Sequence, residues 1–252
     1  MSDTGRGVKT TETSFRIVEA IRDEPGLGIS ALGREVGLSK GAVSKHVHTL
    51  TDLGYLVREG DGYYLSNRFL SLGIQARERF PIEHVRPVVS DLAETTGHVA
   101  NFIAREDDRG IYALRIRPDG SEDGDIAEGD VAPLHATAGG KAILAHLPAD
   151  EKRALLADSS LPAYTEKTLT DRADLERELR SVRDRRVAFD REEYRKGHQC
   201  VASPIIGSEG TAIGAISVTG SDYHMSGKRL EEDAVGLVTS AAKSVENALL
   251  SR

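Results

Sequence analysis

The sequence has 252 residues but only one cysteine and no long apolar run. A single cysteine excludes an internal disulfide, and the N-terminus lacks the apolar core that a signal peptide requires. No stretch approaches the ~20 consecutive apolar residues of a membrane-spanning helix. We therefore expect a soluble, cytoplasmic protein that has no membrane partner.

Positive charge is in the minority: the formal net charge is −7, which taken alone disfavours a nucleic-acid partner. The distribution of charge removes this objection. Residues 1–80 contain 11 basic and 10 acidic residues, which leaves 22 basic and 30 acidic residues for the remainder. The acidic excess, including the segment 121–130, therefore belongs to the C-terminal part of a chain that is long enough for two domains.

Residues 29–53 predict two short helices broken by a glycine turn. Ser30 can cap the first helix, Gly37 can adopt the positive φ of a tight turn, and Ser39 can begin the second helix. The apolar residues of the second helix recur at helical spacing and are expected to face the core: Ala42, Val43, Val47, Leu50 and Leu53. This pattern is typical of a helix-turn-helix.

The other side of the second helix combines small residues, hydrogen-bond donors and positive charge. A recognition helix needs this composition, because small side chains let the backbone approach the major groove while Lys and Ser reach phosphates and base edges. An ordinary surface helix is the alternative interpretation. The candidate DNA-binding residues on this helix are Ser39, Lys40, Gly41, Ser44, Lys45 and His48.

The next segment, residues 54–66, favours the DNA-binding interpretation. Apolar runs at residues 55–57 and 63–65 flank a glycine-rich turn, which is the signal of a β-hairpin. A hairpin directly after a recognition helix is the wing of a winged helix-turn-helix. Arg58, near the tip, is therefore a further candidate for contact with a phosphate or the minor groove.

The rest of the chain mixes helices and strands. A helix over residues 15–21 is expected to pack behind the recognition helix, and residues 67–80 predict a linker helix whose Leu70, Leu72 and Ile74 are candidate dimer contacts. The later pattern predicts helices at residues 82–96, 171–186 and 228–250, a short helix opened by a glycine pair within 134–147, and strands at 98–105, 109–117, 187–190, 198–206 and 211–219. Helices around an antiparallel sheet indicate an α+β domain.

Three segments of the C-terminal part, together with the winged segment, carry a family resemblance. They are LHATAGGKAILAHLP at residues 134–148, VAFDREEYRKGHQCVASPI at residues 187–205 and GAISVTG at residues 214–220. On these motifs the chain resembles transcriptional regulators of the IclR family over nearly its whole length. We accordingly expect a disordered lead-in at residues 1–10, a winged helix-turn-helix DNA-binding domain at 11–66, a linker helix at 67–80, and a GAF/profilin-like α+β effector-binding and oligomerisation domain at 81–252.

The resemblance implies a homodimer, which can pair into a dimer of dimers. In such proteins a small metabolite binds the C-terminal domain and changes how the winged domains sit on double-stranded operator DNA. The resemblance further implies control of a catabolic pathway for a sugar or an organic acid, with no enzyme activity and no cofactor. The positions that match the family's ligand pocket are Ala138, Gly139, Asp190, Cys200, Ser217 and Thr219.

These positions suit a small polar or anionic ligand. A helix that starts at Ala138 presents backbone N–H groups that favour negative charge, and the glycine pair at residues 139–140 leaves them unobstructed. Ser217 and Thr219 are two residues apart on a strand and so point to the same face. The segment 117–132 is more acidic than the family pattern, which leaves the identity of the ligand open.

Three other interpretations of the C-terminal part stay open. A hydrolase would use Cys200 as nucleophile with His198 or His135 as base, although no nucleophile elbow accompanies them. A zinc site would use the same three side chains as ligands, because thiolate and imidazole both bind zinc. The domain could also be a dimerisation platform that binds no ligand.

Overall fold

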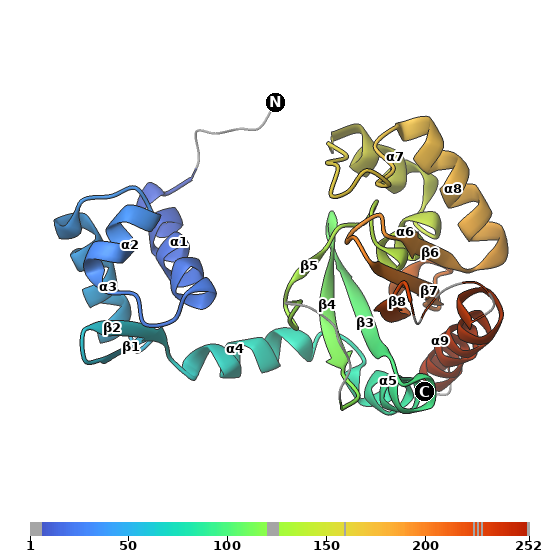
Figure 1. The fold of residues 1–252 in the computed structure, drawn as a ribbon, viewed down its shortest axis with the longest axis horizontal. Coiled ribbons are helices and arrows are strands. Elements are labelled where there is room, and N and C mark those ends of the chain that lie inside the picture. The colour runs from blue at the N-terminus through green and yellow to red at the C-terminus, as the bar shows by residue number, and fades with distance from the viewer. Residues whose placement is uncertain are drawn as a thin grey trace. The chain divides into compact units, whose positions relative to one another are not determined.

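The computed structural model describes residues 7–119, 126–158, 160–223, 225, 227 and 229–250. Residues 121–125 of the acidic segment 121–130 and the first six residues of the chain therefore lie outside the described residues. The chain divides into two compact units, of which the first ends at Arg79 and the second begins at Phe80. Figure 1 shows the elements of each unit.

The first unit is a three-helix domain with a hairpin. Its elements are α1 (Lys9–Asp23), α2 (Ile29–Glu35), α3 (Lys40–Asp52), β1 (Leu56–Glu59), β2 (Gly62–Leu65) and α4 (Arg68–Arg77). Ile17 and Ile21 of α1 are fully buried against Leu32, Val43 and Val47, so the first three helices share one core. The strands β1 and β2 pair in antiparallel register. The predicted winged helix-turn-helix is confirmed.

The turn between α2 and α3 depends on local chemistry that the sequence predicts in part. Gly37 adopts a φ of +68°, as the tight turn requires, and the Ser39 side chain caps α3 by accepting a hydrogen bond from the Ala42 N–H at 3.3 Å. The prediction that Ser30 caps α2 is wrong, because α2 already begins at Ile29 after an extended Gly28.

Three further boundaries differ from the prediction. Helix α1 begins at Lys9, so it extends into the segment 1–10 that was expected to be disordered. Leu53 is 55% exposed rather than buried, because it follows the last residue of α3 as its C-cap. The linker helix α4 ends at Arg77, and Phe80 already packs in the second unit with its ring 6.2 Å from that of Phe102.

The second unit is built on an antiparallel sheet. In the described part of the chain this sheet has six strands in the order β5-β4-β3-β8-β7-β6, and all neighbours are antiparallel. The strands are β3 (Val99–Glu106), β4 (Arg109–Ile116), β5 (Val131–Ala132), β6 (Ala188–Arg191), β7 (His198–Ile206) and β8 (Ala212–Ser221). The predicted α+β class is confirmed.

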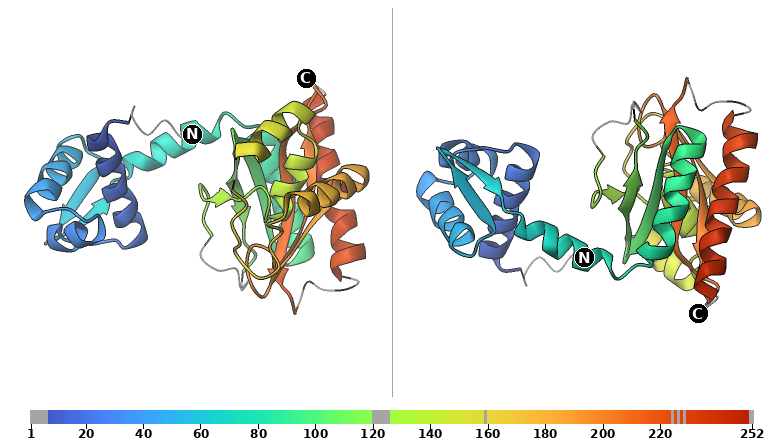
Figure 2. Two further views of the ribbon diagram at one scale, coloured as in Figure 1. Left: turned by 90° about the horizontal axis from the view of Figure 1, so that it is seen from above. Right: turned by 90° about the horizontal axis from the view of Figure 1, so that it is seen from below.

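Helices cover both faces of the sheet (Figure 2). On one face, α5 (Ile82–Thr96) and α9 (Val235–Leu250) lie side by side and bury Val85, Val89 and Val238. The other face carries α6 (Ala138–Ala145), α7 (Ala149–Asp158) and α8 (Arg172–Arg185). The sequence does not predict α7, and a π-helix (Arg229–Ala234) stands where the beginning of the last helix was expected.

A buried carboxylate joins α9 to the sheet. Glu246 Oε1 accepts a hydrogen bond from the backbone N–H of Ile206 at 2.8 Å and pairs with Arg186, while its Oε2 lies 3.2 Å from Lys243 Nζ. Burial by itself would raise the pKa of Glu246, but these donors outweigh burial and hold the pKa below its ordinary value. The ionised side chain therefore stabilises the packing of α9 on β7.

No helix in the described parts of the chain is long and apolar enough to cross a bilayer.

Candidate functional site

The exposed side of α3 carries the residues that were predicted to meet DNA. Val43 and Val47 are buried in the core of the first unit, whereas the opposite side of the helix is open to solvent. On that side Ser39, Lys40, Gly41, Lys45 and His48 are exposed and Ser44 is half-buried. The structure therefore places all six predicted residues of this helix on one surface, which we call the recognition face.

The charges of the recognition face are available for a partner. Neither Lys40 nor Lys45 forms an ion pair with a residue that the structure describes, and His48 Nε2 lies 3.4 Å from the exposed carboxylate of Asp52. An exposed ion pair of this kind contributes little stability, so His48 can exchange it for another acceptor at small cost.

Arg58 lies in the wing, where local contacts hold its exposed side chain. Its Nε donates a hydrogen bond to the carbonyl of Gly60 at 2.9 Å, and its Nη2 lies 3.4 Å from an Asp61 carboxylate oxygen. The guanidinium carbon also lies 6.0 Å from the centre of the Tyr63 ring. Arg58 would have to release Asp61 before it could bind a phosphate with the same nitrogen.

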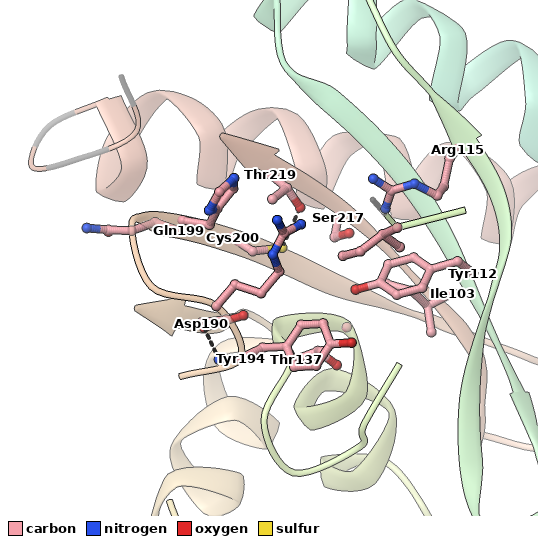
Figure 3. A pocket seen from close by; sticks show the side chains of 14 residues that line it. Ile103, Tyr112, Arg115, Thr137, Asp190, Tyr194, Gln199, Cys200, Ser217 and Thr219 are labelled. Atoms are coloured by element: carbon pink, nitrogen blue, oxygen red, sulfur yellow. Dashed lines mark hydrogen bonds between the residues drawn. The ribbon is translucent and has the colours of Figure 1, made fainter. Parts of the chain in front are cut away.

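The second unit contains a small cavity at the sheet face that α6 covers (Figure 3). Five of the six predicted ligand positions line it: Gly139, Asp190, Cys200, Ser217 and Thr219. The remaining wall residues are Ile103, Tyr112, Arg115, Ile126, Thr137, Tyr194, Arg195, His198 and Gln199. We call this space the inner cavity. Its free volume of about 20 Å³ is close to that of one ordered water.

Ala138 does not line the inner cavity, and the start of α6 differs from the prediction. The N–H of Gly140 is already bound to the Thr137 side chain at 3.0 Å. Both glycines are fully buried, and a Cβ at Gly140 would lie 2.5 Å from Leu134 Cα. The glycine pair therefore serves close packing, and unobstructed N–H groups at this point are not what the structure shows.

A buried amide that the sequence analysis missed organises the floor of the inner cavity. Asn101 Nδ2 donates hydrogen bonds to Ser217 Oγ at 3.1 Å and to Thr219 Oγ1 at 3.3 Å. Its Oδ1 accepts a hydrogen bond from Arg115 Nη1 at 2.7 Å. Ser217 and Thr219 thus point to the same side of β8, as their spacing predicts, and Asn101 links them to a guanidinium.

Two more wall residues, Tyr112 and Arg115, come from β4 and were also missed. Alternation would place residues three apart on opposite faces of a strand. The register of β3 and β4 shifts here: Phe102 pairs with Leu114 and Ile103 pairs with Tyr112, so Ala113 is left over. This bulge turns Tyr112 to the side of Arg115, whose guanidinium carbon lies 4.9 Å from the tyrosine ring centre.

Asp190 holds the turn that forms one wall of the inner cavity. Its Oδ1 accepts hydrogen bonds from the backbone N–H groups of Glu193 at 2.7 Å and Tyr194 at 3.2 Å. Burial, and then the neighbouring charge of Glu193, raise the pKa of Asp190 to about 7. Glu193 is itself buried and pairs with Lys141 of α6. A lysine within the apolar run of α6 is the sequence signal that would have indicated this pair.

Cys200 is a poor nucleophile at neutral pH. Burial, and then the charge of Asp190, raise the pKa of its thiol to about 12, and its Sγ accepts a hydrogen bond from Thr219 Oγ1 at 3.2 Å. The thiolate is the reactive form of cysteine, so a thiol that stays protonated at neutral pH disfavours the hydrolase interpretation.

The three side chains that were considered as zinc ligands are not together. His135 Nε2 donates a hydrogen bond to the Pro162 carbonyl at 3.0 Å, and its ring lies 5.8 Å from that of Tyr164. His198 and Cys200 line the inner cavity, which His135 does not. Within the described residues, no group of three histidine, cysteine or acidic side chains is placed to hold a metal ion.

Comparison with known proteins agrees with both units. Residues 78–247 match the family model described as bacterial transcriptional regulator IclR C-terminal, and residues 7–63 match that of the MarR family. The regulator KdgR of Escherichia coli strain K12 is 28% identical over 91% of this chain and 88% of its own length. The regulator BhcR of Paracoccus denitrificans is 30% identical over 91% of this chain and 84% of its own length.

Solved structures show the same fold. The IclR protein of Thermotoga maritima superposes with a TM-score of 0.81 at 25% identity, covering 96% of this chain and 98% of that one. An IclR homologue from Microbacterium hydrocarbonoxydans, crystallised with 4-hydroxybenzoate, superposes with a TM-score of 0.80 at 20% identity, covering 96% and 100% of the two chains. Because the IclR family model spans almost the whole second unit and the curated relatives, all transcriptional regulators, share both units, the chain belongs to the IclR family of DNA-binding transcriptional regulators.

Proposed function

We propose that this protein represses or activates transcription by binding an operator through the recognition face and the wing, under the control of a small metabolite held in the inner cavity. The observation that carries the proposal is the joint placement of Gly139, Cys200, Ser217 and Thr219 around one small cavity. A ligand can change DNA affinity only if it binds the DNA-competent and DNA-incompetent forms unequally, and such coupling is about 1–3 kcal/mol in regulators.

The chemistry of the inner cavity supports a small polar ligand. Ser217 and Thr219 supply two hydroxyls, which the buried amide of Asn101 orients from the neighbouring strand, and the free volume admits little more than a water until side chains move. The homologue that was crystallised with 4-hydroxybenzoate supports control by a small metabolite. That this metabolite belongs to a catabolic pathway, for an organic acid or a sugar, is part of the proposal.

The DNA side of the proposal can be tested by salt dependence. An operator is first selected from a random duplex pool, and its affinity for the protein is measured at several salt concentrations. Lys45→Ala should weaken binding and reduce the slope of log affinity against log salt by about one, because each phosphate contact releases a counterion. Lys152→Ala on α7 removes the same charge from the second unit and should leave the slope unchanged. Equal slopes for parent and Lys45→Ala would place the contact elsewhere.

The metabolite side can be tested once mass spectrometry has identified a co-purified ligand. Ser217→Ala should weaken its binding by roughly 1–3 kcal/mol in calorimetry if the hydroxyl partners a buried ligand oxygen. Operator binding without ligand should hardly change. Unchanged affinity in both Ser217→Ala and Cys200→Ala would move the site, and a protein that no metabolite stabilises against heat would support the dimerisation-platform alternative.

We also propose a homodimer, which can pair into a dimer of dimers, because two winged domains on a two-fold axis read a pseudo-palindrome. The linker helix supports this proposal: none of the ten residues of α4 is buried, and Leu70, Leu72 and Ile74 are 65%, 44% and 45% exposed. Leu70 and Ile74, four residues apart, share one side of the helix, and exposed apolar side chains of this kind are typical of an interface. Sedimentation that finds only monomer at micromolar concentration would contradict the dimer.

A further inference from the structure

A second cavity adjoins the inner cavity at the turn that contains Tyr194 and Arg195. This larger hollow of about 630 Å³, which we call the outer cavity, is lined by residues 163–166 and 194–196. Tyr194 and Arg195 line both spaces, so these two consecutive residues form the partition between them. A molecule that passes from the outer cavity to the inner one has to displace this partition.

One nitrogen of the Arg195 guanidinium lacks a hydrogen-bond acceptor among the described residues. This nitrogen, Nη1, is buried, yet it donates no hydrogen bond to any residue that the structure describes. A buried guanidinium nitrogen without an acceptor is costly, and such groups in native proteins usually mark the place of a water, an ion or a ligand. Arg195 therefore lacks an acceptor at the point where the two cavities meet.

The charges around the inner cavity say what kind of acceptor fits. Arg115 and Arg195 are permanent cations of the wall, and Asp190 is the one carboxylate among the described wall residues. Because burial and Glu193 raise the pKa of Asp190 to about 7, its negative charge is partly lost at neutral pH. Burial, with the charges of Arg117 and Arg195 adding to it, lowers the pKa of Arg115. Among the described wall residues, positive charge is therefore in excess.

We propose that Arg195 is the selectivity residue of the inner cavity: it admits an organic anion from the outer cavity and binds the anionic group through Nη1. This inference rests on the proposed function and narrows the effector to an anion. The anionic end meets Arg195 at the partition, and the remainder of the molecule reaches the hydroxyls of Ser217 and Thr219. A neutral analogue of the same size binds more weakly, because it offers Arg195 no charged acceptor and is not attracted by the positive charge of the wall.

The chain carries its own reporter for this passage, because Cys200 in the wall of the inner cavity is its only cysteine. Two methanethiosulfonate reagents of equal length are compared, one ending in a sulfonate and the other in trimethylammonium. In each reaction the small ionised fraction of Cys200 attacks the sulfenyl sulfur of the reagent, a disulfide forms and methanesulfinate leaves; the raised pKa of the thiol slows both reagents equally and so does not affect their ratio. Each rate is divided by the rate of the same reagent with the urea-unfolded chain, which removes the intrinsic difference in reactivity.

The anionic reagent should label native Cys200 about tenfold faster than the cationic one after this correction, since the two differ in their interaction with a buried cation. Arg195→Gln, which keeps a donor but loses the charge, should bring the ratio close to one. Lys196→Gln is the matched control: it makes the same charge change on the adjacent residue, which lines only the outer cavity. It should keep most of the preference. Circular dichroism establishes that both variants are folded.

Three results would overturn the inference. A ratio near or below one in the parent would remove the anion preference. An equal loss in Arg195→Gln and Lys196→Gln would assign the preference to general charge at the outer cavity. Labelling no faster than global unfolding would show that the outer cavity is not the entrance. None of these measurements involves DNA or the natural effector, so an anion preference that persists in a protein whose operator binding ignores every metabolite would refute only the proposed function.

Discussion

Replacing Asp190 by Asn should make the stability of the protein less sensitive to pH. The substitution keeps an oxygen at Oδ1, so the hydrogen bonds from the Glu193 and Tyr194 N–H groups can persist. What changes is that the side chain no longer ionises. In the parent, burial and then the charge of Glu193 raise the pKa of this carboxyl from 3.8 in the unfolded chain to about 7 in the fold.

The sign and size of the effect follow from proton linkage. Between pH 4 and pH 7 the folded state holds the Asp190 proton more tightly than the unfolded state, so stability falls as pH rises. With these two pKa values, the cost is roughly 2 kcal/mol at pH 5 and roughly 4 kcal/mol at pH 8. The free energy of unfolding of Asp190→Asn relative to the parent should therefore increase by about 2–3 kcal/mol from pH 5 to pH 8.

Urea unfolding of the parent and the variant at pH 5, 6.5 and 8, followed by circular dichroism, measures this difference directly. The comparison across pH matters more than the absolute stability at one pH, because the new amide N–H₂ has its own hydrogen-bonding needs. Asp150→Asn, which removes a fully exposed carboxylate from α7, is the control and should show no such trend. A difference between parent and Asp190→Asn that stays constant across pH would refute the reasoning.

Four other substitutions test the packing of the second unit by unfolding measurements. Gly140→Ala should destabilise by about 2–3 kcal/mol or more, because its Cβ would meet the backbone of Leu134, whereas Gly139→Ala should cost less because only the end of a flexible side chain has to move. Glu246→Gln should cost about 1–2 kcal/mol at pH 7; since the folded pKa of this carboxyl is lowered, the cost should shrink as pH falls below 4.5 and through that lowered value. Gly236→Ala, at a helical position with nothing within 4 Å, should stabilise by about 0.5 kcal/mol.

Elements whose signal is local could be predicted from the sequence. The apolar spacing of α5 predicts its observed bounds, residues 82–96, and Gly97 ends it with a φ of +67°. Ser39 caps α3 because the side-chain oxygen of an N-cap residue with extended backbone reaches an N–H two or three residues later. In the same way, two-residue spacing alone puts Ser217 and Thr219 on one face.

Features that depend on two distant segments were decided only by the tertiary structure. The bulge at Ala113 arises because the register between β3 and β4 shifts by one residue there. This shift brings Tyr112 and Arg115 to the same cavity. Gly140 packs so closely on the backbone of Leu134 that a Cβ would not fit. This packing, and not a ligand, explains the glycine at that position of α6. Asn101, a polar residue in the buried part of β3, gains its role only from partners more than a hundred residues away on β8. The sequence by itself thus determined the winged domain, through local spacing, and the family, through its motifs, and the family resemblance supplied the predicted ligand positions. Charge and access at the cavity follow from long-range packing.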